Sequence, residues 1–304
     1  KTISMEIPSD VLTARKTDSP ASPRLEWTMI NVNDAGQQGD AHVIRVGNGI
    51  HVLIDAGPQD LAETSLVPFL AERDITSLDL VFISHAHSDH YGGLDALLDH
   101  DVGIKYLYFN LPDRQRCERE VPWGCDYQDV QRIRARLKSR GIELREGKSG
   151  MHWQLGENTS LEILYAFDGE TPPIDRADIN DTSLIMKLIH GGFTSLFTGD
   201  LNEDIGGYLA AHSDYLAADL LKIPHHGIEP VAPELFLEKV APRWGLVSTP
   251  ESFWRGEASA RIRNWFSRHD IPVFVSGISG NVSVLIDNGE LKIRPDLAES
   301  DHQN

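Results

Sequence analysis

The sequence predicts an α+β fold in which two mixed β-sheets pack face to face with helices on the outer faces, an αββα sandwich. Strand patterns fill the first part of the chain and return in the second part, and predicted helices are interspersed throughout. A sheet buries one face against another layer, so this pattern favours two stacked sheets covered by helices. No linker-like stretch interrupts residues 25–295. We therefore expect one domain there, preceded by a flexible polar tether (residues 1–24) and followed by a short tail (residues 296–304).

The first part of the chain is expected to supply five strands. They cover residues 25–32, 42–46, 50–54, 80–83 and 105–109. Gly47-Asn48-Gly49, between the second and third strands, is a strong signal for a β-hairpin. Helical spacing of apolar residues covers 61–72, 94–98 and 126–140. Pro68 is expected to kink the first of these helices and Gly141 to end the last. Residues 110–124 are expected to be irregular.

The second part of the chain repeats the mixture of strands and helices. Strands are predicted over residues 142–144, 161–166, 183–189, 194–198, 220–223, 244–248, 273–276, 283–286 and 291–294. Helices are predicted over residues 204–211, 233–240 and 259–268. Gly191-Gly192 is expected to turn one strand back onto the next.

Composition limits the classes of partner. Of the 304 residues, 40% are hydrophobic and 24% are charged, which suits a domain with a substantial core. The formal net charge of −18 disfavours a broad surface for nucleic acid or anionic membranes. No run approaches 18 apolar residues, so we expect no transmembrane segment. Basic side chains at positions 132, 134, 136, 138 and 140 predict a solvated helix face, with a substrate-guiding patch as the alternative.

The start of the chain and the two cysteines bear on location. The chain begins at Lys1 rather than Met, and residues 17–23 are a polar stretch rich in serine and proline. We expect an extracytoplasmic protein, periplasmic or secreted, which a segment before Lys1 could export or anchor; a cytoplasmic location stays open. Cys117 and Cys125 are predicted to form a disulfide, and two free thiols are the alternative.

The stretch richest in chemistry is residues 84–90, Ser-His-Ala-His-Ser-Asp-His, which follows the predicted strand 80–83. Neutral imidazole and carboxylate are good ligands for Zn²⁺ and its first-row neighbours. His85 and His87 are two residues apart in extended chain, so they point to the same side and can bind one ion. Asp89 and His90, at the turn into the next helix, can bind a second. A strand-end cluster of this kind is typical of a metal site, whereas a lone histidine would be read as a solvated loop residue.

Two later strand ends offer further ligands. Asp200 follows Thr198 and Gly199 at the end of an apolar strand, and a carboxylate there can bridge two cations. The alternative is that Asp200 caps the helix that follows. His225 and His226 stand at the end of the strand 220–223, and spacing alone does not separate their roles.

His85-x-His87-x-Asp89-His90 resembles the HxHxDH signature of the metallo-β-lactamase superfamily, whose members are binuclear hydrolases. The resemblance implies the same αββα fold, with Asp200 as the bridging ligand of a TGD motif. It implies that His226, which precedes Gly227, is the last ligand and that His225 lies near the substrate. Many members place a histidine where this chain has Asn180-Asp181, so we expect Asp181 to replace it as a ligand, with Asn180 as the neighbour that could take its place.

A narrower resemblance rests on the order of several motifs. They are Gly36-Gln37-Gln38-Gly39-Asp40-Ala41, Leu53-Ile54-Asp55-Ala56-Gly57, Asn180-Asp181-Thr182-Ser183-Leu184, Gly191-Gly192, Thr198-Gly199-Asp200-Leu201 and Lys222-Ile223-Pro224-His225-His226-Gly227. Together they resemble the hydrolase domain of bacterial competence DNA-uptake proteins of the ComEC type and its free-standing relatives. The first loop carries an extra glutamine, and Phe253–Glu257 replaces a YGHP-like segment. Asp55 is expected to orient a ligand histidine, and Asp40 either to face the metals or to form a turn.

These features predict a metal-dependent hydrolase with two Zn²⁺ ions per chain, and with Mn²⁺ as an alternative in the first site. Paired ions activate water and neutralise charge in the transition state, and Asp89 or His225 would handle the proton. The resemblance favours a phosphodiester substrate. The alternatives are a carboxylic ester, lactone or β-lactam, or a metal-binding module without activity. Because of the acidic surface, we expect a small or flexible phosphodiester as the partner and no strong binding of duplex nucleic acid.

Overall fold

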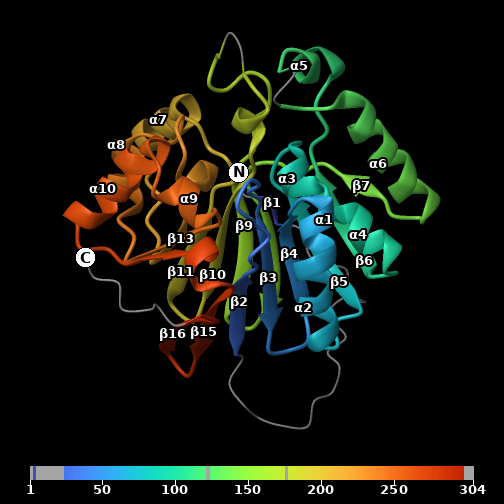
Figure 1. Ribbon diagram of the computed structural model, residues 1–304, viewed down its shortest axis with the longest axis horizontal. Helices are drawn as coiled ribbons and strands as arrows, with labels where there is room; N and C mark the ends of the chain where they lie inside the picture. The colour runs from blue at the N-terminus through green and yellow to red at the C-terminus, as the bar shows by residue number, and fades with distance from the viewer. Residues whose placement is uncertain (1–2, 5–23, 121–123, 175–176, 298–304) are drawn as a thin grey trace.

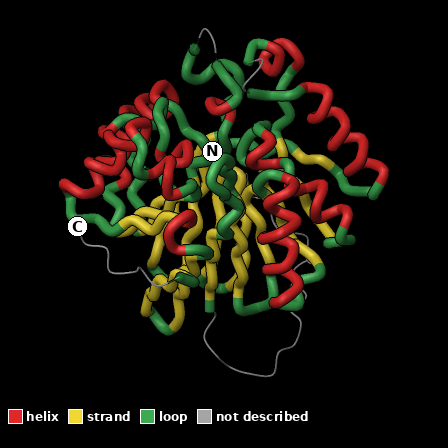
Figure 2. Tube along the Cα trace, viewed as in Figure 1, coloured by secondary structure: helices red, strands yellow, loops and turns green. Residues whose placement is uncertain are grey.

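Two eight-stranded mixed sheets packed face to face form the centre of the protein (Figure 1). The structure is a computed structural model that describes residues 3–4, 24–120, 124–174 and 177–297. Helices cover the outer face of each sheet, and the layers are seen edge-on in Figure 2 as strands between two groups of helices. The predicted αββα class is therefore confirmed.

The first sheet, called sheet I, combines the last two strands of the domain with strands from its first half. In spatial order it contains β16 (Glu290–Pro295), β15 (Val282–Asp287), β2 (Leu25–Met29), β3 (Ala41–Val46), β4 (His51–Ala56), β5 (Ser77–Ile83), β6 (Gly103–Phe109) and β7 (Leu144–Arg145). β3 and β4 form the predicted hairpin, and β4 to β7 run parallel. Because β15 pairs with β2, the end of the domain closes onto its beginning.

The second sheet, called sheet II, is built from residues 151–275, with the short strand β1 at one edge. In spatial order it contains β1 (Ile3–Ser4), β8 (Met151–Gly156), β9 (Thr159–Tyr165), β10 (Ile185–His190), β11 (Phe193–Phe197), β12 (Leu220–Lys222), β13 (Trp244–Val247) and β14 (Val273–Val275). β9, β10 and β11 are antiparallel, and β11 to β14 are parallel. The carboxyl ends of parallel strands in each sheet are where loops with functional side chains are expected.

Helices on the two outer faces bury separate apolar cores. Those on the sheet I side are α1 (Gln59–Leu61), the π-turn Ala62–Leu66, α2 (Val67–Glu72), α3 (Ser88–Tyr91), α4 (Gly93–Asp99), α5 (Arg114–Glu118) and α6 (Tyr127–Ser139). Those on the sheet II side are α7 (Glu203–His212), α8 (Glu234–Val240), α9 (Glu251–Trp254), α10 (Ala260–Arg268) and α11 (Ser276–Ser279). A third core lies between the sheets and includes Trp27, Phe82, Trp153 and Phe197.

Several elements differ from the sequence prediction. The strand β8 was not predicted, because its pattern places only Trp153 and Leu155 in the core among polar neighbours. Helix α5 lies in the segment expected to be irregular, and Asp113 caps it by accepting a hydrogen bond from the Arg116 backbone N–H at 2.8 Å. Pro68, which has no N–H to donate, lies at the start of α2 directly after the π-turn.

Two other expectations can be compared with the described residues. Within the predicted tether, Ile3–Ser4 pairs with β8 and Arg24 leads into β2, whereas residues 1–2 and 5–23 lie outside the described part. Cys117 and Cys125 form the predicted disulfide, with their Cα atoms 4.9 Å apart. Among the described helices, none is both long and apolar enough to cross a membrane.

Three arginines of the basic stripe on and just after α6 are already paired within the domain. Arg132 and Arg136 both contact Asp95 on α4 at 2.5 Å, and Arg136 also contacts Asp99. Arg140 pairs with Asp101 at 2.7 Å. Three of the five basic residues of this stripe therefore bind α4 and its following turn, which weakens the alternative of a free substrate-guiding patch.

Trp27 provides a test of the core between the sheets. Its fully buried ring lies 4.7 Å from that of Phe197 in the opposite sheet, and its Nε1–H donates to His42 at 3.3 Å. We expect Trp27→Ala to lower the free energy of unfolding by about 3–5 kcal/mol, because it leaves a large cavity between the sheets. The matched control is Leu235→Ala, whose side chain is exposed on α8 and should change stability by about 0.5 kcal/mol or less. Urea denaturation measures both, and equal midpoints for the two variants would contradict this account of the core.

Candidate metal centre

The candidate ligands meet at one edge of the sandwich, where strands of both sheets end. β4 and β5 of sheet I lead into Asp55 and the segment 84–90. β11 and β12 of sheet II lead into Asp200 and the turn Pro224–Gly227. Ligands far apart in the sequence thus come together because parallel strands end at the same edge.

The first group of ligands, called cluster 1, consists of His85, His87 and Asp200. Their ligand atoms all lie within 4.8 Å of one another. His85 Nε2 is 3.1 Å from His87 Nδ1 and 3.8 Å from the Asp200 carboxylate. His87 Nε2 donates to Glu120 at 2.9 Å when it carries the proton, and its Nδ1 lone pair then faces His85. Two imidazole nitrogens and a carboxylate oxygen facing one point form a typical site for a divalent transition metal.

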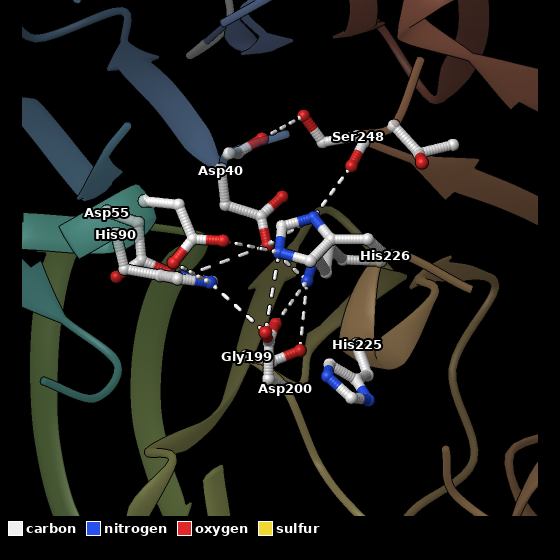
Figure 3. Close-up of polar contacts among 12 residues, drawn as sticks. Asp40, Asp55, His90, Gly199, Asp200, His225, His226 and Ser248 are labelled. Atoms are coloured by element: carbon white, nitrogen blue, oxygen red, sulfur yellow. Dashed lines mark hydrogen bonds and ion pairs between the residues drawn. The ribbon is translucent and has the colours of Figure 1, made fainter. Parts of the chain in front are cut away.

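The second group, called cluster 2, consists of Asp89, His90, His226 and again Asp200, and the last three are labelled in Figure 3. Asp40 also offers a carboxylate oxygen within 4.8 Å of ligand atoms of His90, Asp200 and His226. The Nε2 atoms of His90 and His226 each lie 3.3 Å from Asp200 Oδ2. Asp89 lies 3.4 Å from His226 Nε2 and 3.9 Å from His90 Nε2. Asp200 belongs to both clusters, which is the geometry that a bridging carboxylate requires.

The partners of the two buried histidines select which nitrogen faces cluster 2. Asp55 accepts from His90 Nδ1 at 2.9 Å, and the Ser248 carbonyl accepts from His226 Nδ1 at 2.7 Å. In the neutral form of each ring the proton is thereby assigned to Nδ1, and Nε2 is the nitrogen whose lone pair can bind a metal. Among the described residues these two Nε2 atoms and Asp200 Oδ1 are buried without a hydrogen-bond partner. Such orphaned buried atoms are costly unless a ligand satisfies them, so the residues fit a pair of bound cations.

Asp40 lies beside cluster 2 without facing its ligand nitrogens. Its carboxylate contacts the ammonium of Lys222, and it approaches His226 and His90 on their Nδ1 sides, at 4.0 and 3.9 Å. Lys222 also donates to the Gly199 carbonyl at 2.9 Å and lies 3.6 Å from Asp200 Oδ1. Asp40 and Lys222 are therefore placed to orient the rings of His90 and His226 from the side opposite their Nε2 atoms.

Burial and opposite charges act against each other on the pKa values of the centre. Burial, the largest influence, lowers the pKa of His226, but Asp200 and Asp40 outweigh it and raise that pKa to about 10. Burial also opposes protonation of His90, yet Asp200 and Asp55 hold the His90 pKa well above its ordinary value. The same pairs overcome burial at Asp200 and keep its pKa well below the usual range. Without a metal, the two histidines thus hold protons that balance the buried carboxylates.

Three predicted site residues lie outside both clusters. The structure does not bring Asp181 into either ligand set: its Oδ2 accepts from the Asp178 N–H at 2.9 Å, and burial followed by Asp178 raises the Asp181 pKa to about 7. Asn180 contacts His225 Nε2 through Nδ2 at 3.4 Å. His225 lies apart from the carboxylates in Figure 3, and its Nδ1 contacts the Pro230 carbonyl.

The alternative role for Asp200, capping the next helix, does not occur. α7 begins at Glu203 with Asn202 in the N-cap position, and the backbone N–H of Asp200 donates to Ser183 Oγ at 3.1 Å. Asp200 is therefore free to direct its carboxylate at the histidines.

Sequence reasoning missed two residues of the centre. Lys222 occurs within an apolar strand, and a lysine in such a run could have been recognised as a buried counter-ion. Glu120 lies between the two cysteines, and no sequence pattern connects it with His87. Only the fold brings these two side chains together.

Comparisons with known proteins identify the family and the fold. Residues 35–107 match the profile described as the Metallo-beta-lactamase superfamily. The crystal structure of CmlA, a diiron beta-hydroxylase from Streptomyces venezuelae, superimposes with a TM-score of 0.53 and 11% identity over 88% of this chain and 55% of CmlA, which shows a shared fold. This chain therefore contains a metallo-beta-lactamase superfamily domain.

Within that superfamily, two competence proteins are homologues at modest identity. ComE operon protein 3 of Bacillus subtilis (strain 168) is 26% identical over 80% of this chain, and Competence protein ComA of Neisseria gonorrhoeae is 25% identical over 86%. The chain spans only 29% and 33% of the lengths of these two relatives. The resemblance to the ComEC type is thereby confirmed for the part of those proteins that the chain matches.

The shared position of Asp200 makes the number of bound metals testable. We expect wild-type protein to bind two divalent ions, His87→Ala to lose the cluster 1 ion, and Asp200→Asn to weaken both, because Asp200 contacts both clusters. His100→Ala is the matched control, since His100 pairs with Glu63 at 3.0 Å on the surface away from the centre. Elemental analysis and calorimetric titration measure the stoichiometry. Wild-type protein purified without chelator that carries no transition metal would contradict the assignment.

The raised pKa of His226 gives an expected pH dependence for metal binding. In the metal-free protein His226 keeps its proton below about pH 10, and that proton must leave before Nε2 can bind a metal. We therefore expect the apparent metal affinity to rise between pH 6 and pH 9 and proton release to accompany binding at pH 7. Titrations in buffers of different ionisation enthalpy count the protons. An affinity that stays constant over this range would show that His226 does not ligate through Nε2.

Proposed function

We propose that this protein is a metal-dependent hydrolase that holds two divalent ions, zinc in the first instance, and cleaves a phosphodiester. The observation that carries the proposal is the position of Asp200, whose carboxylate faces the Nε2 atoms of His85, His90 and His226 at 3.3–3.8 Å. Three imidazole nitrogens with available lone pairs around one carboxylate form the arrangement needed for two neighbouring cations.

The roles of the ligands follow from their partners. His85, His87 and Asp200 would hold one ion. Asp89, His90, His226 and Asp200 would hold the other, since Asp89 and Asp200 both lie near the Nε2 atoms of the two histidines. When bound, the two ions would supply a nucleophilic hydroxide at neutral pH and neutralise the charge that develops on the phosphoryl oxygens. Nitrogen-rich ligation in cluster 1 favours zinc, whereas an added carboxylate from Asp181, as the sequence predicts, would favour Mn²⁺.

Two side chains are suited to handle the proton. Asp89 is the more exposed carboxylate of cluster 2, with 24% of its side chain accessible, so it can contact both the centre and a solvent molecule. His225 has Nδ1 against the Pro230 carbonyl, so Nε2 is its basic nitrogen; Nε2 accepts a hydrogen bond from Asn180 Nδ2 at 3.4 Å and would take up the proton in place of that contact. Asp89 would act next to the attacking water, and His225 on the substrate side.

Charge supports a small or flexible substrate. The net charge of −18 opposes the approach of long duplex nucleic acid, and the stripe on α6 is already engaged by Asp95, Asp99 and Asp101. A short phosphodiester or a single flexible strand presents fewer phosphates to repel and can reach the paired cations. The resemblance to competence proteins supports this substrate class over a carboxylic ester, lactone or β-lactam.

The disulfide supports an extracytoplasmic location. Structural disulfides persist in oxidising compartments such as the periplasm or the extracellular space. Cys117–Cys125 is the single disulfide of this chain, which contains two cysteines. We propose that the domain works in such a compartment.

Activity on a simple phosphodiester tests the proposed reaction. We expect wild-type protein to hydrolyse bis(p-nitrophenyl) phosphate, EDTA to remove the activity and added Zn²⁺ or Mn²⁺ to restore it. Asp89→Ala should reduce turnover by at least about 100-fold, since Asp89 contributes to both metal binding and proton transfer. His100→Ala should retain full activity, and circular dichroism checks that the Asp89 variant keeps its fold.

Other outcomes separate the alternatives. Turnover of nitrocefin or a lactone without phosphodiester hydrolysis would favour the carboxylic-acid derivatives. Two bound metals without turnover of any of these substrates would favour a non-catalytic module. Full activity of Asp89→Ala, or sub-micromolar binding of duplex DNA at physiological salt, would overturn the proposal.

A further inference from the structure

Glu120 joins the disulfide-bonded segment to cluster 1. Its Oε2 lies 2.9 Å from His87 Nε2, and its Oε1 accepts from the backbone N–H of Ile179 at 2.5 Å. Ile179 precedes the turn Asn180–Thr182. One carboxylate therefore binds a candidate metal ligand and the turn beside the centre at the same time.

The backbone around Glu120 is fixed by Cys117 and Gly124. The N–H of Glu120 donates to the Cys117 carbonyl at 3.2 Å, and the Gly124 N–H donates to the Glu120 carbonyl at 3.0 Å. The disulfide then ties Cys117 to Cys125, the residue that follows Gly124. Figure 1 shows α5, which ends just before Glu120, above the edge of the sheets and beyond α3.

Gly124 is also in direct contact with the Glu120 side chain. A Cβ atom at Gly124 would lie 2.4 Å from Glu120 Cβ and 2.2 Å from Oε2. Contacts this short do not occur between real atoms, so any larger residue at position 124 must displace Glu120. The Glu120 carboxylate can therefore occupy its position only because Gly124 has no side chain.

We propose that Glu120 is a positioning residue for cluster 1 and that the Cys117–Cys125 disulfide and Gly124 hold it against His87. A carboxylate that accepts from one imidazole nitrogen fixes the ring orientation and leaves the other nitrogen available as a ligand. Here it fixes the proton on His87 Nε2 and presents Nδ1 to His85 and Asp200. The inference rests on the proposed metal centre, and it adds that affinity for the cluster 1 ion depends on a segment outside the ligand set.

The disulfide also holds the segment that carries Glu120 against the domain. Cys117 is fully buried against the core of sheet I, so the covalent link fixes one end of the segment in the domain interior. Glu120 and His87 are also mostly buried, with 16% and 17% of their side chains exposed, so water weakens their contact less than at the surface. The disulfide thereby restricts the movement of the segment that carries Glu120, and so helps to keep Glu120 in contact with His87.

Metal titration of Glu120→Ala tests the inference. We expect affinity for the cluster 1 ion to fall by about 10–100-fold, which is typical when the partner of a metal-bound histidine is lost, and affinity for the cluster 2 ion to stay unchanged. Glu120→Gln should lie between, because its single side-chain oxygen can accept from His87 or from Ile179 but not from both. The matched control is Glu63→Ala, which removes an exposed carboxylate 3.0 Å from His100.

Two further variants test the holding role of the segment. We expect Gly124→Ala and the double variant Cys117→Ala/Cys125→Ala to weaken the cluster 1 ion as Glu120→Ala does. Added to Glu120→Ala, either change should cause no further loss, because all of them act through one contact. Gly124→Ala leaves the disulfide intact, so it still tests the proposal if the variant without the disulfide fails to fold.

A spectroscopic readout separates positioning from a general structural role. In zinc-saturated protein, ¹⁵N chemical shifts of His87 should report a proton on Nε2 alone in the wild type and a mixture of tautomers in Glu120→Ala. Equal metal affinities and tautomers in Glu120→Ala and Glu63→Ala would overturn the inference. An equal loss at both clusters together with a lower melting temperature would also overturn it in favour of a structural role. Wild-type protein that binds no metal would instead overturn the proposed metal centre itself.

Discussion

The contact of Asp200 with three buried histidines is the interaction on which the rest of the centre depends. Transferring a carboxylate out of water costs several kcal/mol unless opposite charge and hydrogen bonds compensate for it. Asp40, Asp55 and Asp200 are almost fully buried within one small region, and Lys222 is the buried lysine beside them. Protonated histidines provide the remaining positive charge when no metal is bound. Cations at the two clusters would provide it instead, by accepting the nitrogen lone pairs that the protons otherwise occupy.

This concentration of charge is possible because hydrogen bonds hold the two sheets together at the same edge. The Ser84 carbonyl of sheet I accepts from Leu184 N–H at 3.0 Å, next to the start of β10. Ser248, after β13, donates to the Gly39 carbonyl at 2.6 Å while its own carbonyl orients His226. These contacts cross between the sheets within a residue or two of the ligands. The packing of the sandwich therefore sets the distances in the centre directly.

The comparison with competence proteins concerns this domain alone. The chain matches about a third of the length of those relatives. In those relatives the matched part is one portion of a longer chain. The structure adds a physical reason why such a portion can be an independent unit: β15 pairs with β2, so the strands from both ends of residues 25–295 lie side by side. Within that unit both clusters, their orienting partners and all three apolar cores are complete among the described residues.

The sequence by itself determined the fold class and the order of the candidate ligands. Apolar runs ending in His85, Asp200 and His226 mark strand ends, and period and turn chemistry are local properties that a sequence displays directly. The strand β8 was not predicted, because only two of its side chains, Trp153 and Leu155, are buried, and two positions are too few to show an alternating pattern. The sequence prediction also placed Asp181 among the ligands, where the structure pairs that carboxylate with the Asp178 backbone. Spacing left the roles of His225 and His226 open; the resemblance favoured His226, and the structure places His226 against Asp200. The tertiary structure alone decided that Glu120 and Lys222 support the centre. Those outcomes depend on contacts between segments that the sequence separates, such as Lys222 with Asp40 and Glu120 with His87, and these contacts arise only when the chain folds and the two sheets pack.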